Sequence, residues 1–471
     1  MNFHQTTLLC ALLAIAGQSA DWPHWGGGSG RNMINTVEKN LPDDWDVKSG
    51  KSVKWKVKLG SLTYGSAVVA DGRVYIGTNN EAHLDPNVKG DKGNIVVVAE
   101  KDGSFLWQAV HDKLSAGRVN DWPHQGICST PQVVGDRLWY LSNRCEATCA
   151  DVNGFADQND GMTAETYTAT GHADVIWSYD MIEELGVFPH NLATSSPLVD
   201  DGIVFLITGN GVDEGHLNIP VNSAPSFVAF DAKTGELLWE FAVEERILHG
   251  QWSSPSMGIV DGQKQIYLPG GDGWLYALSP KDGKLIWKFN CNPPDAVWEL
   301  GGYGTKNNLI ATPVFADNVV YIGVGQDPEH GVGIGHLYAI NAKGSGDITK
   351  TGALWHRGND EFGRTISTAS VLDGLVYIAD ISGILYCLDQ KTGKAHWSHD
   401  LKSAVWGSTM VADGKVYIGD ETGKINIFAH AKTKQHIRTI DMRETVYGTA
   451  TAANGVLYIA TKTQLYAIAA E

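Results

Sequence analysis

The chain has 471 residues, of which 54 are glycine, 16 are tryptophan and 16 are tyrosine, and 43% are hydrophobic. This turn-rich, aromatic composition favours an all-β globular protein. The formal net charge of −17, with no basic stripe, argues against nucleic acid as a partner because phosphate groups would be repelled.

The N-terminal segment 1–20 carries an apolar run, LLCALLAIA, followed by small residues and then by DWPHW at 21–25. This order is typical of a secretory signal peptide, although no Lys or Arg precedes the run. We therefore expect residues 1–20 to be removed and the mature protein to be periplasmic or secreted. No later apolar stretch predicts a transmembrane segment.

Eight segments repeat along the rest of the chain and predict eight equivalent units. Each joins a tight turn, usually Asp-Gly, to an alternating apolar strand with an aromatic residue at a fixed place, as in ADGRVYIG (70–77). The shortest spacing between these aromatics is about forty residues, the length of a four-stranded propeller blade. The aromatics are Tyr75, Trp139, Phe205, Tyr267, Tyr321, Tyr377, Tyr417 and Tyr458.

A tryptophan marks the fourth strand of most units, and Ile437 takes its place in the seventh. The eighth unit ends after its third strand. The segment VKWKVKL (53–59) alternates like a fourth strand, and pairing it into the last blade removes two open sheet edges. The sequence thus predicts an all-β fold: a single eight-bladed β-propeller of four-stranded antiparallel blades over 53–471, closed by strand 53–59 and preceded by an N-terminal arm over 21–52.

The units resemble the pyrroloquinoline-quinone (PQQ) repeat, whose mark is A-x-D-x-x-T-G-x-x-x-W. AFDAKTGELLW (229–239) and CLDQKTGKAHW (387–397) carry this pattern almost intact, and DWPHW at 21–25 is similar to the lead-in of secreted bacterial proteins of this class. The resemblance covers residues 53–471. It implies the propeller fold but not one activity, because propellers host many unrelated functions.

Most of the irregular sequence is expected on one face. Because antiparallel strands alternate in direction, the second-to-third connections and the links between blades share a face. His124, His190 and His249 each precede the innermost strand of a blade, so we expect them side by side at the mouth of the central funnel. The long insertions of this face are 79–93, 109–125, 180–190, 209–225, 290–309 and 325–335.

The loops after the second strands add carboxylates and further imidazoles to this face. Such groups suit a transition metal or calcium when three or more converge. The competing interpretation is that a wet funnel needs a polar lining and that duplicated repeats align their histidines, since no pair has a tight H-x-x-x-H spacing. The candidate metal ligands are His124, His190, His249, Glu214, His216, Glu329 and His330.

The resemblance to quinoprotein dehydrogenases implies a second set of candidates. In those enzymes a funnel-bound quinone stacks on a tryptophan, touches an arginine and holds calcium through Glu, Asn and Asp. The chain lacks their adjacent Cys-Cys pair and a haem segment, and its inner-strand tryptophans are also explained by packing between blades. The candidate cofactor-binding residues are Trp252, Glu299, Asn307, Arg364 and Trp406.

Two hypotheses for the function follow. The first is an exported propeller that binds a protein or small-molecule ligand through its funnel face, similar in architecture to the periplasmic propeller of outer-membrane β-barrel assembly. The second is an oxidoreductase with PQQ and calcium, or a transition metal, in the same funnel. A hydrolase is disfavoured because the chain has no G-x-S-x-G elbow.

Overall fold

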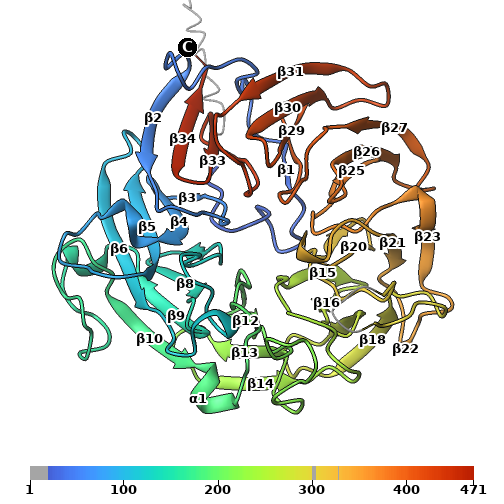
Figure 1. The fold of residues 1–471 in the computed structure, drawn as a ribbon, viewed down its shortest axis with the longest axis horizontal. Coiled ribbons are helices and arrows are strands. Elements are labelled where there is room, and N and C mark those ends of the chain that lie inside the picture. Colours follow the sequence, from blue (N-terminus) through green and yellow to red (C-terminus); the bar gives the residue numbers. More distant parts are fainter. Residues whose placement is uncertain (1–19, 300–303, 327, 471) are drawn as a thin grey trace, which may run out of the picture.

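The computed structural model describes residues 20–299, 304–326 and 328–470 and shows a ring of β-sheets around a central axis (Figure 1). Residues 1–19 of the predicted signal peptide lie outside the described part of the chain. Within that part, the strands form eight sheets, each with four antiparallel strands at its centre. The prediction of an eight-bladed propeller is therefore confirmed.

The first four blades use consecutive stretches of the chain. Blade 1 contains β3 (Val68–Ala70), β4 (Arg73–Asn79), β5 (Lys92–Ala99) and β6 (Phe105–Asp112). Blade 2 contains β7 (Gln132–Val134), β8 (Arg137–Leu141), β9 (Glu146–Asp151) and β10 (Val175–Asp180). Blade 3 contains β11 (Leu198–Asp200), β12 (Ile203–Ile207), β13 (Phe227–Asp231) and β14 (Leu237–Phe241). Blade 4 contains β15 (Ser256–Val260), β16 (Gln263–Pro269), β17 (Trp274–Leu278) and β18 (Leu285–Asn290).

The other four blades complete the ring. Blade 5 contains β19 (Val314–Ala316), β20 (Val319–Val324), β21 (His336–Asn341) and β23 (Ala353–Arg357). Blade 6 contains β24 (Ser370–Leu372), β25 (Leu375–Ala379), β26 (Ile384–Asp389) and β27 (Ala395–Asp400). Blade 7 contains β28 (Met410–Ala412), β29 (Lys415–Gly419), β30 (Lys424–Ala429) and β31 (His436–Asp441). Blade 8 contains β32 (Thr451–Ala453), β33 (Val456–Ala460), β34 (Gln464–Ala469) and β2 (Val53–Lys58).

Two further strands and a few short helices lie outside this pattern. The strand β1 (Ile34–Asn35) pairs in parallel with β28, and β22 (Gly346–Asp347) pairs in parallel with β18. The helical elements are α1 (Met181–Leu185), η1 (Asn80–Ala82), η2 (Gly117–Val119), η3 (Gly154–Ala156), η5 (Pro328–His330) and η6 (Asn359–Glu361). Among the residues described, no helix has both the length and the apolar character needed to cross a bilayer.

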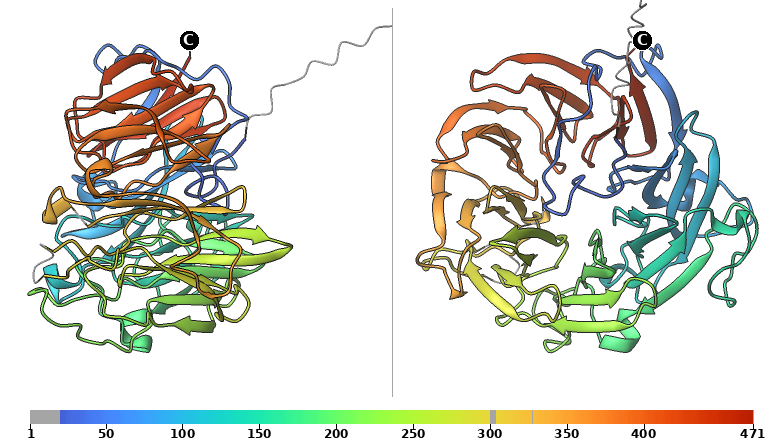
Figure 2. Two further views of the ribbon diagram at one scale, coloured as in Figure 1. Left: turned by 90° about the vertical axis from the view of Figure 1, so that its right-hand side faces the viewer. Right: turned by 180° about the vertical axis from the view of Figure 1, so that it is seen from behind.

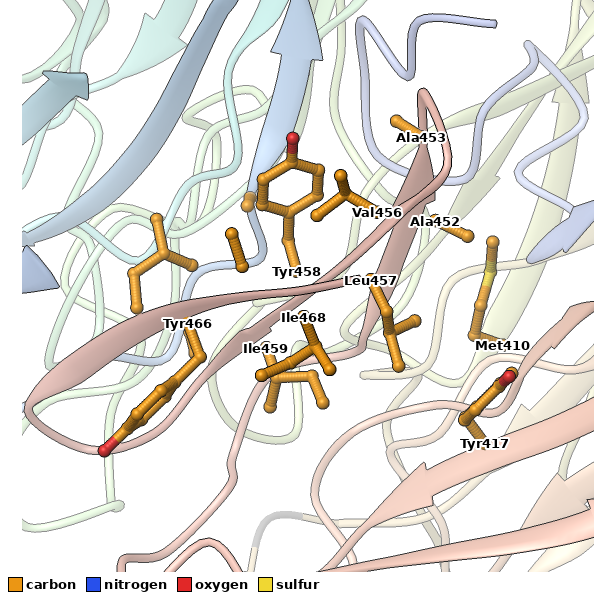
Figure 3. Packing of buried hydrophobic residues seen from close by; sticks show 14 of the residues in the cluster. Met410, Tyr417, Ala452, Ala453, Val456, Leu457, Tyr458, Ile459, Tyr466 and Ile468 are labelled. Carbon is orange, nitrogen blue, oxygen red and sulfur yellow. The ribbon is translucent and has the colours of Figure 1, made fainter. Parts of the chain in front are cut away.

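The ring closes where the sequence predicts, through β2. This strand runs antiparallel to β34, with Trp55 opposite Ala467 and Val57 opposite Leu465. Its apolar side chains join a core cluster that also holds buried residues of β32 and β33. Figure 3 shows Leu457, Ile459 and Ile468 of this blade packed together beside Met410 and Tyr417 of blade 7.

The tryptophan of the repeat links seven of the eight blades to the next one. In blade 3, the Asp231 carboxylate accepts backbone N–H bonds from Lys233 and Thr234 and so shapes the turn. Gly235 follows with φ +73°, and a Cβ there would lie 2.6 Å from the Trp177 ring of blade 2. The Trp177 Nε1 donates to the Ala232 carbonyl at 3.0 Å. Trp55, Trp107, Trp239, Trp287, Trp355 and Trp397 make the same kind of bond to Glu100, Val152, Pro280, Ala342, Gln390 and Ala431.

Blade 7 has Ile437 in place of the tryptophan, and the segment before β2 compensates at its junction with blade 8. Trp45 is 2% exposed in the shared core, and its Nε1 donates to the Met442 sulfur at 3.2 Å. The Glu38 carboxylate accepts backbone N–H bonds from Asn454 at 3.0 Å and Gly455 at 2.6 Å. The N-terminal segment thus strengthens the junction that lacks the repeat bond.

The same segment crosses the face that carries the inner hairpin turns, on the side opposite the long loops. It adds backbone or side-chain hydrogen bonds to one blade after another, beginning with Trp22 on Val69 of blade 1 and reaching blade 7 through β1. At its centre the wholly buried Arg31 donates to the carbonyls of Pro197 and Pro255. The blue segment crossing the middle of the ring in Figure 2 is this arm.

Candidate functional site

Four histidines from separate loops meet on the long-loop face. His190 and His249 precede β11 and β15, His216 follows β12, and His330 lies in η5 after β20. The ring centroids are 4.4 Å apart for His190 and His249, 5.0 Å for His190 and His216, and 4.6 Å for His216 and His249. His330 lies 4.7 Å from His249 and 5.7 Å from His216. These four residues are called the histidine cluster below.

Local backbone structure explains why these loops come so close. A Cβ at Gly211 would lie 2.7 Å from the His190 Cβ and 2.9 Å from the His249 carbonyl oxygen, so glycine permits the contact. His216 has the left-handed φ of 58°. Its N–H donates to the Asp213 carbonyl at 3.0 Å, and the Asp213 carboxylate accepts from the Leu217 N–H at 2.8 Å. Asp213 therefore shapes the turn that places the His216 ring.

Among the described residues, the group of convergent ligand atoms does not include the other predicted metal ligands His124, Glu214 and Glu329. The His124 side chain is 61% exposed, and its Nδ1 hydrogen-bonds the Glu81 carboxylate at 2.6 Å. Hydrogen bonds from Ser61 and His124 lower the pKa of Glu81. Glu214 is exposed, and Glu329 is exposed at the edge of the funnel pocket described next. His124 occupies the repeat position of His190 and His249, but its loop directs the imidazole to Glu81 instead.

A cavity of about 270 Å³, here called the funnel pocket, opens at the mouth of the central channel. Its walls are mostly aromatic and branched aliphatic side chains, and a few polar residues border them. Burial raises the pKa of the Cys128 thiol at its edge to about 12, so this cysteine is not a thiolate at neutral pH. The lining residues are Tyr64, Trp122, Gln125, Cys128, Asn191, Leu192, Thr194, Trp252, Ile310, Glu329, Ile366 and Trp406.

Two of the predicted cofactor residues, Trp252 and Trp406, face this pocket. Trp252 stacks on the His190 ring at 5.9 Å, and its Nε1 donates to the His190 carbonyl at 3.0 Å. Trp406 contacts Tyr64 at 5.7 Å and Tyr447 at 5.0 Å. The sequence analysis did not identify Tyr64. The signal was present, because TYGS (63–66), VWGS (405–408) and VYGT (446–449) repeat at the start of three inner strands.

The comparisons with known proteins agree with this architecture. A PQQ-repeat family model, described as that of the outer membrane protein assembly factor BamB, matches residues 168–346 and 335–471. The chain belongs to the PQQ-repeat β-propeller family. It is 24% identical over 255 residues to the outer membrane protein assembly factor BamB of Moranella endobia (strain PCIT), covering 53% of this chain and 55% of that protein.

Two further proteins similar to this chain in sequence or in fold are named as dehydrogenases. Polyvinylalcohol dehydrogenase of Pseudomonas sp is 21% identical over 361 residues, which cover 69% of this chain and 54% of that protein. The chain therefore spans about half the length of these curated relatives. The europium-containing methanol dehydrogenase structure has a TM-score of 0.58 at 12% identity, covering 96% of this chain and 98% of that one. The structure of BamB from Moraxella catarrhalis has a TM-score of 0.55 at 16% identity, covering 88% and 98%.

The residues proposed to hold PQQ do not form one site in this PQQ-repeat protein. The Arg364 guanidinium is 5% exposed and donates to the Asn307 side chain at 3.1 Å and to the carbonyls of His330 and Gly304. Arg364 and Asn307 thus anchor the loop of His330. Glu299 is exposed beside a different cavity. Of the five residues, only the two tryptophans line the funnel pocket, so this set does not fit the quinone.

A second cavity, of about 290 Å³, lies at the outer strands of blades 1 and 2. Glu165 lines it together with His111, Tyr140 and Glu146. Burial raises the pKa of Glu165 to about 7, although its Oε1 accepts a hydrogen bond from the Val175 N–H at 2.8 Å. The Glu165 carboxyl therefore titrates near neutral pH in the folded protein.

Replacing Glu165 with glutamine is expected to flatten the pH dependence of stability. Between the ordinary pKa of 4.5 and the folded value of about 7, the folded state binds a proton that the unfolded state lacks. The stability from the protonated carboxyl is therefore lost as pH rises through 7. Urea unfolding should show that the free energy of unfolding of Glu165→Gln, relative to that of the wild type, is higher at pH 8 than at pH 5. An equal difference at both pH values would contradict this.

Proposed function

We propose that this protein is exported and binds a partner protein at its funnel face, with an aromatic or apolar side chain of the partner inserted into the funnel pocket. The observation that carries the proposal is the pocket wall, in which Trp122, Trp252 and Trp406 face one concave space with Leu192 and Ile366. A hollow lined by aromatic side chains on a rigid scaffold is typical of sites that receive an anchor residue.

Four further observations support this proposal. The pocket edge carries Gln125, Asn191 and Glu329, which give the polar rim common around an apolar anchor site. The long loops of the ring surround the same mouth, and loops on rigid scaffolds are where binding sites are usually built. The similarity to the assembly factor BamB favours a protein partner, and the pattern of residues 1–20 favours export.

Selection of random displayed peptides on the mature chain tests the proposal, with Trp406→Ala as the decisive variant. No described residue accepts a hydrogen bond from the Trp406 Nε1, so this substitution breaks no hydrogen bond of the described fold. Selected peptides should carry an aromatic or large aliphatic residue. Their affinity for Trp406→Ala should fall by about 30-fold or more, as expected for a hot-spot tryptophan worth about 2 kcal/mol.

The control is Leu285→Ala, which removes a 38% exposed side chain of β18 on the outer edge of blade 4. Peptide affinity should not change there. PQQ with calcium serves as a second probe, because the oxidoreductase hypothesis requires it to bind. If PQQ binds in a Trp406-dependent manner and no peptide does, the dehydrogenase function replaces the one proposed. If Trp406→Ala behaves like Leu285→Ala for every probe, the funnel pocket is not the binding site.

A further inference from the structure

The histidine cluster has the dimensions of a metal site. The nitrogen atoms that His190, His216 and His249 could offer as ligands lie within 4.8 Å of one another. An ion bound by imidazole at about 2.0–2.1 Å needs its donor nitrogens about 3–4 Å apart, so small side-chain rotations suffice. The three rings come from three different loops and meet at nearly equal centroid distances of 4.4 to 5.0 Å.

One imidazole is oriented as metal-binding histidines usually are. The Nδ1 of His190 lies 2.8 Å from the Val212 carbonyl oxygen, which can only accept, so Nδ1 carries the proton. Nε2 is then the nitrogen with a lone pair, and a carbonyl holding the other ring nitrogen is the common arrangement behind a metal ligand. The Trp252 ring stacked on His190 further restricts the orientation of the imidazole.

Burial and the local turn also favour a metal site at these histidines. His190 is 0% and His249 2% exposed, whereas His216 is partly exposed. The Asp213 turn holds the left-handed backbone of His216 and so fixes the position of its ring.

We propose that His190, His216 and His249 together bind one divalent transition-metal ion of the zinc or copper class, with His330 beside them as a fourth ring. Imidazole is a preferred ligand of both ions, and copper should bind more tightly than zinc. The site has one buried side at His190 and His249 and one side open to solvent at His216. This inference is separate from the proposed partner binding, because none of the four histidines lines the funnel pocket, although Trp252 borders the pocket and also stacks on His190.

The test uses the untagged mature chain, treated with EDTA, dialysed, and titrated separately with Zn²⁺ and Cu²⁺. Equilibrium dialysis with elemental analysis should give one ion per chain. His216→Ala should weaken binding by at least about 100-fold, since even residues behind metal ligands are worth about 10–100-fold. The metal should also raise the melting temperature of the wild type and not that of His216→Ala. The copper electron paramagnetic resonance spectrum should show nitrogen ligands.

The matched control is His124→Ala, which removes an exposed imidazole from the same face but outside the cluster. Its stoichiometry and affinity should equal those of the wild type. Thermal melting without metal checks that His216→Ala is folded. Sub-stoichiometric binding, or equal affinity for His216→Ala and His124→Ala, would overturn the inference. Trp406→Ala should retain the ion and His216→Ala should retain peptide binding, so failure of one proposal leaves the other testable.

Discussion

Replacing Trp287 with alanine is expected to lower the free energy of unfolding by about 3–5 kcal/mol. The side chain is 0% exposed in the core between blades 4 and 5. Its Nε1 donates to the Ala342 carbonyl at 2.9 Å and lies 3.0 Å from the Gln265 side-chain oxygen. The substitution leaves a large cavity and removes a hydrogen-bond donor from two buried acceptors, and both effects destabilise.

Guanidinium unfolding followed by far-ultraviolet circular dichroism measures this loss. Trp287→Phe should cost less, because it keeps most of the apolar contact and loses only the hydrogen bonds, worth about 1–3 kcal/mol. Leu238→Ala on β14 is the control, since this side chain is 45% exposed and its truncation should change stability by less than about 0.5 kcal/mol. A Trp287→Ala midpoint equal to that of Leu238→Ala would refute the role of the inter-blade tryptophan.

Replacing Arg31 with alanine is expected to destabilise the ring by about 3 kcal/mol or more, although this residue belongs to no blade. Its guanidinium is 0% exposed and donates to the carbonyls of Trp25, Pro197 and Pro255. Each buried carbonyl deprived of its donor costs about 1–3 kcal/mol. Lysine should restore only part of the loss, because an ammonium cannot reproduce the fixed fork of the guanidinium.

The measurement is again chemical unfolding, together with limited proteolysis of the N-terminal segment. Arg31→Ala should release this segment for cleavage at protease concentrations that leave the wild type intact. Arg443→Ala is the matched control, because that side chain is 62% exposed and forms a surface ion pair with Asp441 at 3.4 Å. If Arg31→Ala and Arg443→Ala shift the midpoint equally, the buried arginine contributes no more than a surface ion pair.

The repeat made most of the fold predictable. A turn, an apolar strand and an aromatic residue recur in the same order in all eight units, so the number of blades and the closing role of Val53–Lys58 followed from pattern alone. The path of residues 21–52 did not, because this segment has no periodicity, and Arg31 stands among glycine and serine residues that read as a loop. Its position depends on contacts with distant blades, which local sequence does not encode.

The sequence predicted on which face of the propeller the candidate site lies, but not which histidines converge there. Strand direction placed the histidines on one side, and the structure brings His190, His216 and His249 together there. The same rule included His124, which Glu81 holds elsewhere. The difference lies in loop conformation: the left-handed backbone of His216 and the close approach at Gly211 depend on side-chain hydrogen bonds and packing between loops.

The route of the N-terminal arm has a consequence for the order in which the molecule assembles. Asn35 donates to the carbonyl of Ala452, 417 positions later in the chain, so Asn35 cannot reach this final neighbour until almost the whole polypeptide is present. Contacts of such long range slow folding, because the entropy of closing the loop is lost before the contact stabilises it. Once it is bound, the N-terminal arm connects blades formed early in the chain to blades formed late. Unfolding of the terminal blades therefore requires that the hydrogen bonds of this arm break first.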